Sequence, residues 1–294
     1  MSSASDRASD RASERASERA VESPIDPFIA LDRHPIDDPV TARRQRETLD
    51  RDGALVLAGF FTPTLVAAVL DQSLPRIDEA FFTVDRTHNV YLTPPDPTLA
   101  DSHVFNRQIV STKGCLAHDQ IPADSPLRAI YDSPRFQLFL CRLLGIESIH
   151  PYADNVSGIN VHFHLDGQEL GWHFDNSSFA VTALMQAPES GGTFDYVPDL
   201  RDADRGDQNF DGVEAVLNQS EQRMTSAGKT ATSPIRTLDF DPGALVLFRG
   251  RNSLHRVTPS RGSWPRVLVV FAYNTEPGIG LSEAAKQTFY GRSR

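Results

Sequence analysis

The sequence predicts an α+β fold, in which a mostly helical N-terminal part packs on an antiparallel sandwich or barrel of short strands. In the first half, apolar residues recur at helical spacing behind Thr62-Pro63 and Ser133-Pro134. Proline favours the first position of a helix, because the N–H that it lacks would have no partner there. From Ser157 onward the apolar period changes to two, in short runs separated by glycine and proline. This pattern is typical of antiparallel sheets.

Residues 1–23 form a region of a different kind. The tetrapeptide Ala-Ser-Asp-Arg occurs twice from Ala4, and Ala-Ser-Glu-Arg follows twice from Ala12. Four residues cannot form a supersecondary unit that stacks on its neighbours, and the repeat has no apolar face to bury. We therefore expect a disordered, low-complexity tail.

Residues 24–150 are predicted to be the helical N-terminal part of the folded domain. We expect a helix at 39–52, a short strand within 53–59, a helix from Pro63, and a helix from Pro134 that ends at Gly145. Glycine ends helices well because it adopts the left-handed conformation at low cost. One or two strands are expected in this half.

Residues 151–280 are predicted to hold the sheets. Strands are expected at 158–165, 169–174, 179–185, 193–197, 235–240, 244–248, 253–257 and 266–273. A polar insertion at 199–232, with a helix around 213–217, interrupts them. Long insertions in compact domains are often lids or binding loops, so this insertion and residues 101–113 are the two candidate lids. Residues 281–294 are expected to be a C-terminal tail.

Composition excludes several classes of function. The chain has 294 residues and a formal net charge of −10, with no basic stripe, which argues against a nucleic-acid partner. No apolar run approaches the roughly 20 residues of a membrane-spanning helix. The two cysteines, Cys115 and Cys141, make neither a disulfide framework nor a zinc knuckle. We expect a cytoplasmic protein that acts on a small-molecule substrate.

Three residues have the pattern of a metal site. His173 and Asp175 lie two apart in an extended segment, so their side chains share one face, with Cα atoms about 7 Å apart. His255 comes from a later predicted strand. Two imidazoles and one carboxylate on one side of a metal leave the opposite positions open, which suits non-haem Fe(II) chemistry. The alternative is a surface histidine beside a turn-forming acid, together with a core histidine bonded to backbone.

A competing metal site is His162-x-His164 with Glu169 after the turn. Alternation places both imidazoles on one face, and the spacing is that of a cupin-type site. The glycine before this motif is badly spaced for a cupin, so we favour a polar strand face with partial access to solvent. A hydrolytic zinc enzyme is disfavoured, because no glutamate lies near His173 as a general base.

Several motifs together resemble the Fe(II)/2-oxoglutarate-dependent dioxygenase superfamily. They are Gly171-Trp-His-Phe-Asp175, Asp241-Pro-Gly-Ala-Leu-Val-Leu-Phe248, His255-Arg-Val-Thr-Pro259 and the strand that opens at Arg266. The resemblance covers residues 157–278 well and 50–75 loosely. It implies a double-stranded β-helix (jelly-roll) core and an Fe(II) ion held by His173, Asp175 and His255. It also implies 2-oxoglutarate and O2 as cosubstrates.

The far carboxylate of 2-oxoglutarate needs a fixed cation, and a guanidinium pairs with it through two hydrogen bonds without losing its proton. Arg266 is where the resemblance places this residue. Arg256 directly follows His255, so alternation points it to the opposite face, and Arg261 lies in a turn.

Two asparagines are further candidates for the site. Asn274 shares a face with Arg266 along the last predicted strand, and Asn160 lies in the strand that follows Ser157. We predict that both contact the cosubstrate or the substrate.

The resemblance implies an oxygenase that hydroxylates a C–H bond of a small polar metabolite, such as an amino acid or a natural-product intermediate, and releases succinate and CO2. Related halogenases replace the carboxylate ligand with a small residue, which opens a site for chloride. Asp175 occupies that position here, so hydroxylation is expected rather than halogenation. Desaturation, cyclisation and epimerisation use the same ligands. The remaining alternatives are the cupin-type enzyme and a jelly-roll protein that binds its ligand without turnover.

Overall fold

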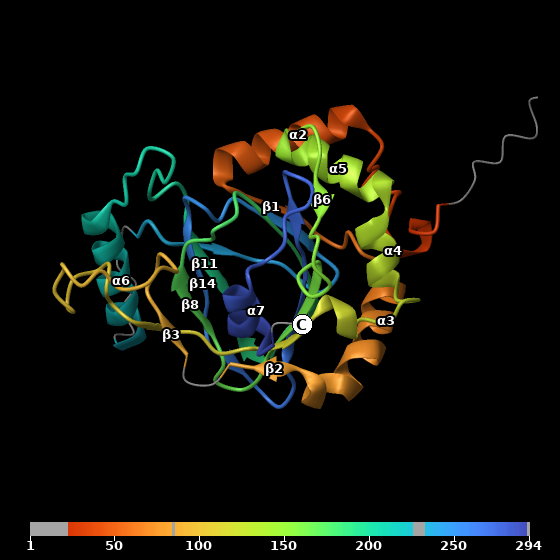
Figure 1. The fold of residues 1–294 in the computed structure, drawn as a ribbon. Helices are drawn as coiled ribbons and strands as arrows, with labels where there is room; N and C mark the ends of the chain where they lie inside the picture. The colour runs from red at the N-terminus through yellow and green to blue at the C-terminus, as the bar shows by residue number, and fades with distance from the viewer. Residues whose placement is uncertain (1–22, 84–85, 226–232, 293–294) are drawn as a thin grey trace, which may run out of the picture.

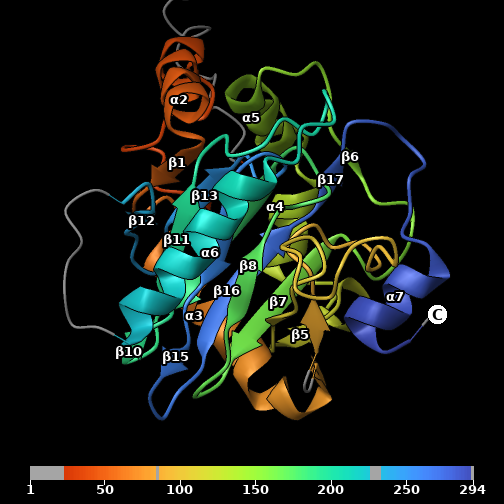
Figure 2. The ribbon, with the colours of Figure 1, turned by 90° about the vertical axis from the view of Figure 1, so that its left-hand side faces the viewer.

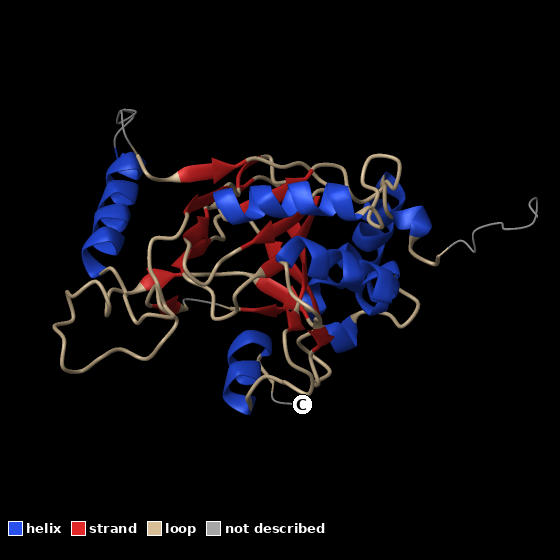
Figure 3. Cartoon of the chain, turned by 90° about the horizontal axis from the view of Figure 1, so that it is seen from above, coloured by secondary structure: helices blue, strands red, loops and turns tan. Residues whose placement is uncertain are grey.

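The computed structural model describes residues 23–83, 86–225 and 233–292. The predicted disordered tail thus lies outside the described residues, except for Ser23. The described chain forms two main antiparallel sheets with helices on their outer sides (Figure 1). Seen from above, most strands lie between the single helix α6 (Phe210–Thr225) on the left and the N-terminal helices on the right (Figure 3).

The larger sheet has seven strands in the order β1-β13-β9-β16-β7-β5-β2. They are β1 (Ala54–Leu57), β2 (Phe81–Phe82), β5 (Gly114–Leu116), β7 (Ile159–His164), β9 (Ala180–Gln186), β13 (Leu245–Phe248) and β16 (Arg266–Phe271). The smaller sheet has four strands in the order β12-β11-β14-β8. They are β8 (Leu170–His173), β11 (Phe194–Val197), β12 (Arg236–Leu238) and β14 (Leu254–Val257).

Three two-stranded ribbons and nine helices complete the described residues. The ribbons pair β3 (Thr87–His88) with β4 (Ile109–Val110), β6 (His150–Pro151) with β17 (Tyr273–Asn274), and β10 (Ser190–Gly191) with β15 (Ser260–Arg261). The α-helices are α2 (Pro39–Asp52), α3 (Pro63–Ser73), α4 (Pro126–Asp132), α5 (Pro134–Leu144), α6 (Phe210–Thr225) and α7 (Glu283–Tyr290). The 3₁₀ helices are η1 (Asp26–Phe28), η2 (Leu74–Glu79) and η3 (His118–Gln120). Within the described part of the chain, no helix combines the length and apolarity that crossing a membrane requires.

Helices begin and end at the capping residues that the sequence offers. Thr62 and Ser133 precede α3 and α5, and each hydroxyl accepts a 3.4 Å hydrogen bond from the backbone N–H of the third residue of its helix. These hydroxyls satisfy N–H groups that a helix leaves unpaired. Helix α5 ends at Gly145, which has a φ of 71°. The helices predicted at 39–52, from Pro63 and from Pro134 are confirmed.

The main hydrophobic core lies between helices α2 to α5 and the outer face of the larger sheet. Val161 and Phe163 of β7 are buried in this core. Successive side chains of a strand point to opposite faces, so His162 and His164 of the same strand face the smaller sheet. The helices therefore cover the apolar face and leave the inner face to polar groups.

Helix α6 covers the outer face of the smaller sheet (Figure 2). Its Val213, Val216 and Leu217 share a second hydrophobic cluster with Trp172 and Phe174. Both hydrophobic clusters pack against the outer faces of the sheets. The space between the inner faces therefore does not have to be filled by apolar side chains.

Two predictions about elements are wrong. The N-terminal half holds six strands, β1 to β6, instead of one or two. Those after β1 are two or three residues long, too short to show a hydrophobic period. The segment predicted to be a C-terminal tail contains helix α7, which Ser282 caps and Gly291 ends.

Replacing Phe139 by alanine should destabilise the protein by about 3–5 kcal/mol, because the cavity left by a buried ring is only partly refilled. This ring is 2% exposed and stacks on Phe60 with centroids 5.6 Å apart. Urea denaturation measures the loss. The matched control is Leu138→Ala on the same helix, where the side chain is 50% exposed and a change within about 0.5 kcal/mol is expected. Equal midpoints for both variants would contradict the core described here.

Candidate active site

Three side chains converge on one point between the sheets. His173, the last residue of β8, pairs across strands with His255 of β14, and the ring centroids are 4.1 Å apart. Asp175 Oδ1 lies 3.6 Å from His173 Nε2 and 3.5 Å from His255 Nε2. One ligand atom of each residue lies within 4.8 Å of the others, and among the described residues this is the one such group. The structure thus brings together the three predicted metal ligands.

Backbone hydrogen bonds fix the position of Asp175 after β8 ends. The N–H of Phe174 donates to the carbonyl of Val90 at 2.8 Å, and the N–H of Asp175 donates to the carbonyl of Gly250 at 3.0 Å. A Cβ atom at residue 250 would lie 1.8 Å from Asp175 Oδ2. Only glycine therefore leaves room for this carboxylate, and that requirement was not visible in the sequence.

Backbone carbonyls orient both imidazoles. Nδ1 of His173 lies 2.8 Å from the carbonyl of Gly171, and Nδ1 of His255 lies 3.0 Å from that of Ser253. A neutral ring that donates from Nδ1 carries its lone pair on Nε2, the atom that faces Asp175. Both rings thus present a metal-binding nitrogen to the same point.

The charge states also suit a metal. Burial, with a smaller contribution from His255, lowers the pKa of His173 to about 3, so this ring is neutral at pH 7. Burial by itself raises the pKa of Asp175, but the interactions with His255 and His173 outweigh it and hold the pKa below its ordinary value. Neutral imidazoles and an ionised carboxylate are the forms that bind a cation.

A cavity of about 360 Å³ adjoins the three residues, between the inner faces of the two sheets. This volume is in the range of small-molecule sites. Most of the wall is apolar and includes Phe81, Leu92, Leu170, Leu268, Leu281 and Phe289. Phe289 belongs to α7, so the C-terminal segment forms part of the cavity wall.

The two predicted lids have different outcomes. The described residues of the 199–232 insertion do not line the cavity; α6 packs on the outer face of the smaller sheet instead. Residues 226–232 lie outside the described residues. The segment 101–113 does contribute Ser111 and Lys113 to the wall.

Arg266 lines the same cavity and has no carboxylate partner among the described residues. It is 2% exposed, and its Nη1 is buried without a hydrogen bond. Both ring nitrogens of His164, its cross-strand partner, and the hydroxyl of Ser260 are also buried without partners. Burial lowers the pKa of Arg266 to about 10, so the guanidinium is still charged at pH 7. A buried cation beside unpaired polar atoms is the setting that an anionic ligand would satisfy.

The other two candidate arginines are placed as the sequence predicts. Arg256 points to the outer side, where its Nη2 lies 3.0 Å from Asp195 Oδ2 and its guanidinium lies 4.9 Å from the Trp172 ring centroid. Arg261 is exposed in the ribbon strand β15. Neither lines the cavity.

The alternative cupin set does not assemble. His162 and His164 share the inner face of β7, but no metal group containing them and Glu169 exists among the described residues. The charges that act on Glu169 are those of Arg256 and Arg261. The favoured interpretation of a polar strand face with partial access to solvent holds for His162, which is partly exposed and lines the cavity, and is wrong for His164, which is 1% exposed.

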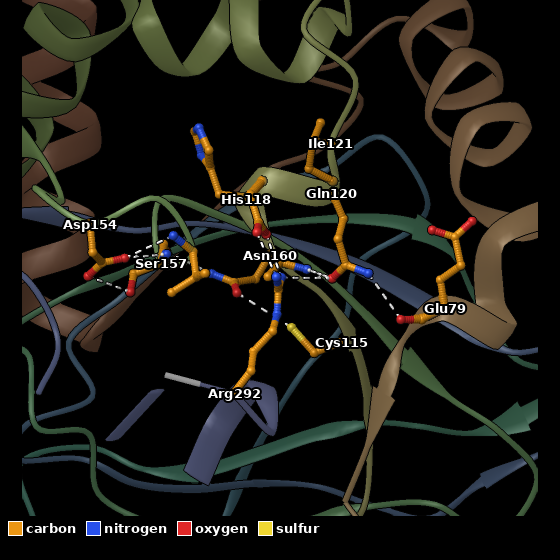
Figure 4. A network of polar contacts seen from close by, with 12 residues as sticks. Glu79, Cys115, His118, Gln120, Ile121, Asp154, Ser157, Asn160 and Arg292 are labelled. Atoms are coloured by element: carbon orange, nitrogen blue, oxygen red, sulfur yellow. Dashed lines mark hydrogen bonds and ion pairs between the residues drawn. The ribbon is translucent and has the colours of Figure 1, made fainter. Parts of the chain in front are cut away.

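The two asparagines lie away from the predicted contacts. Asn160 Nδ2 donates to the carbonyl of Ser157 at 2.8 Å and its Oδ1 accepts from Cys115 Sγ at 3.4 Å, within the polar network of Figure 4. It lines a smaller neighbouring pocket instead of the main cavity. Asn274 lines neither pocket, because β16 ends at Phe271 and residue 274 belongs to β17, which pairs with β6.

Sequence reasoning missed three basic residues of the cavity wall: His88, Arg86 and Lys113. The ring of His88 lies edge-on to that of His173, with centroids 6.1 Å apart. These residues come from β3 and from the residues that flank β3 and β5, which are too short for a period. No pattern in the sequence marks them.

Replacing Gly250 by alanine should weaken metal binding roughly 10- to 100-fold, the range seen when the groups that orient ligands are altered. The new methyl group would overlap the Asp175 carboxylate and displace it. Isothermal titration calorimetry with Fe(II) under anaerobic conditions measures the change in affinity.

Gly280→Ala is the matched control for this variant. Its Cβ would also lie beside an aspartate, but at 3.3 Å from Asp154 Oδ2, and wild-type affinity is expected. Unchanged affinity in Gly250→Ala would mean that Asp175 is not a ligand.

The metal-free protein should lose stability as the pH falls below about 6.5. Burial lowers the pKa values of His162, His164 and His173 in the folded state. Below the ordinary histidine pKa, the unfolded chain therefore binds protons that the folded chain does not, at a cost of at most about 1.4 kcal/mol per pH unit for each histidine. Urea denaturation between pH 7 and pH 5 measures the slope. In His164→Gln the free energy of unfolding should depend less steeply on pH. A dependence identical to that of the wild-type protein would mean that His164 does not contribute to it.

Comparisons with known proteins relate the chain to one protein family and to two solved structures. A family model described as halogenase D matches residues 40–288. The α-ketoglutarate-dependent carbocyclase SnoK from nogalamycin biosynthesis is 12% identical at a TM-score of 0.53, covering 79% of this chain and 83% of that chain. The epimerase SnoN from the same biosynthesis is 14% identical at a TM-score of 0.51, covering 81% and 84%. No curated protein sequence matches the chain.

Both of these solved structures are described as non-haem α-ketoglutarate-dependent enzymes. The predicted fold, a double-stranded β-helix with helices packed on it, is the fold of these two structures and is confirmed. The chain belongs to the halogenase D family.

Proposed function

We propose that this protein is an Fe(II)- and 2-oxoglutarate-dependent oxygenase that hydroxylates a C–H bond of a small polar metabolite. One observation carries the proposal: the group of His173, Asp175 and His255 shares a cavity with Arg266, a buried cation that pairs with no carboxylate of the described residues. The first feature fits Fe(II) with open coordination positions. The second fits the far carboxylate of a dicarboxylate cosubstrate.

Each residue has a role that follows from its position. His173, Asp175 and His255 would hold the metal, and the carbonyls that accept from Nδ1 keep both imidazoles in the correct tautomer. Arg266 would pair with the far carboxylate of 2-oxoglutarate, beside the unpartnered polar atoms of His164. When bound, Fe(II) and 2-oxoglutarate activate O2 for attack on the substrate, with release of succinate and CO2. The apolar walls keep water away from the reacting atoms.

The family description raises the question of halogenation. The sequence resemblance implies that a halogenase would carry a small residue where this chain has Asp175, and that the free position would take chloride. Here the carboxylate occupies that position, and Gly250 leaves the space that it needs. Hydroxylation therefore fits this chain better than halogenation. Product mass distinguishes hydroxylation from the ring closure or epimerisation that the names of SnoK and SnoN describe.

Anaerobic addition of Fe(II) and 2-oxoglutarate should give the wild-type protein a visible charge-transfer band, because the metal and the cosubstrate that together form the chromophore are then both bound. Asp175→Ala should abolish the band. Arg266→Met should keep it but raise the Kd for 2-oxoglutarate at least about 30-fold, because a buried charge pair is lost. Absorbance titration measures both effects.

Glu169→Ala is the control, since Glu169 is the acid of the rival cupin set. This variant should retain the band with wild-type affinity. A band that depends on Glu169 but not on Asp175 would favour the cupin set, and a wild-type protein without any band would refute the proposed function.

A further inference from the structure

The cavity holds more positive charge than the proposed cosubstrate accounts for. Its described lining includes three cationic side chains, Arg86, Lys113 and Arg266, and one carboxylate, Asp175. Arg266 is assigned above to 2-oxoglutarate and Asp175 to the metal. Two cations therefore remain without a partner of opposite charge among the lining residues.

Lys113 is held with its ammonium group inside the cavity. Its backbone N–H donates to Thr83 Oγ1 at 3.1 Å, and its Nζ lies 3.3 and 3.1 Å from the two ring nitrogens of His162. No carboxylate lies within ion-pair distance of Nζ among the described residues. An ammonium has three donors and a neutral imidazole has one acceptor, so at least two donors remain for a ligand. Burial lowers the pKa of Lys113, and the smaller effect of the Asp175 charge, which raises it, does not offset that.

The position of Lys113 differs from that of Arg266. Arg266 lies opposite His164 on β7, whereas Lys113 contacts His162, two residues earlier on the same face. Residues two apart on a strand are separated by about 7 Å. The two cations thus lie beside successive inward-facing residues of β7. The polar atoms of His164 and Ser260 that lack hydrogen bonds lie near Arg266 and not near Lys113. One carboxylate at Arg266 leaves Lys113 free for a second anion.

Arg86 adds a second positive charge to this part of the cavity. Its charge acts on Lys113, and its Nη1 donates to the carbonyl of Thr288 at 2.8 Å, with the guanidinium 5.3 Å from the Phe289 ring centroid. Burial lowers its pKa as well. The two cations and the apolar side chains of α7 therefore border the same part of the cavity.

We infer that Lys113, supported by Arg86, binds a carboxylate of the primary substrate, a second anion site distinct from the one at Arg266. This inference rests on the proposed function and names its substrate class: a small carboxylic acid whose remainder is apolar or neutral. Phe81, Leu92, Leu281 and Phe289 supply the apolar wall. A basic side chain on the substrate is disfavoured, because the described lining offers it no carboxylate other than Asp175.

An anchored carboxylate also explains how a small substrate is positioned. A molecule held only by apolar walls would present several C–H bonds to the metal. A charge-assisted contact at one end fixes the distance from the anchor to the reacting carbon. Lys113 is thus a positioning and specificity residue, and it does not touch the reacting atoms.

The test uses butyrate and its uncharged isostere butyramide as probes. Each is titrated by calorimetry into the anaerobic wild-type protein saturated with Fe(II) and 2-oxoglutarate, so that the Arg266 position is already filled. Butyrate should bind at least about tenfold more tightly than butyramide, because a hydrogen bond between charged groups exceeds one to a neutral amide by about this factor. n-Butylamine should bind more weakly than either.

Lys113→Met should remove the preference for butyrate and leave the Kd for 2-oxoglutarate, read from the charge-transfer band, unchanged. Lys113→Arg keeps the charge and should retain the preference, which shows that the site is intact. Lys286→Met is the matched control: this lysine lies on α7 but does not line the cavity, and the preference should persist.

Three outcomes would overturn the inference. One is equal binding of butyrate and butyramide by the wild-type protein, and another is a preference that survives in Lys113→Met. The third is a Lys113→Met variant that loses affinity for 2-oxoglutarate, which would assign Lys113 to the cosubstrate. In each of these cases the band still forms in the wild-type protein. Failure of the proposed function is recognised separately, by the absence of that band.

Discussion

The cross-strand pairing of His173 with His255 is the contact on which the site depends. Strand register changes in whole residues, and a slip by one residue would turn an imidazole to the opposite face. The register is secured from outside, because Trp172, Phe174 and Leu254 are buried beneath α6. The apolar residues that alternate with the ligands therefore determine where the ligands lie, although none of them enters the cavity.

This arrangement places unusual groups in the interior. Arg266 is buried and Lys113 is partly buried between the sheets, and neither has a carboxylate within ion-pair distance among the described residues, while the neutral ring of His164 is buried beside Arg266 without a hydrogen bond. Such burial is unfavourable by itself, and the protein tolerates it because the large cores under α2 to α5 and under α6 supply stability elsewhere. Buried polar groups without partners are expected at sites where a protein binds a ligand.

The sequence predicted those parts of the molecule that have a period or a cap. The strand alternation from Ser157 onward and the proline-led helices gave the two sheets and α2, α3 and α5, and the His-x-Asp spacing gave the ligand group. The strands β2 to β5 are too short to carry a period, so Lys113 and Arg86 could not be placed. Asn274 was misplaced because alternation was extended past Phe271, where the strand ends. The space at Gly250 depends on a contact between distant segments, which no local pattern encodes.

Helix α7 gives the chain a link between its last helix and its interior. Arg86 holds the carbonyl of Thr288 while its guanidinium also borders the cavity. By thermodynamic reciprocity, any occupant that favours this arrangement of Arg86 strengthens the docking of α7, and docking of α7 strengthens retention of the occupant by the same factor. A change that weakens the docking of the C-terminal helix should therefore weaken substrate binding by the same factor.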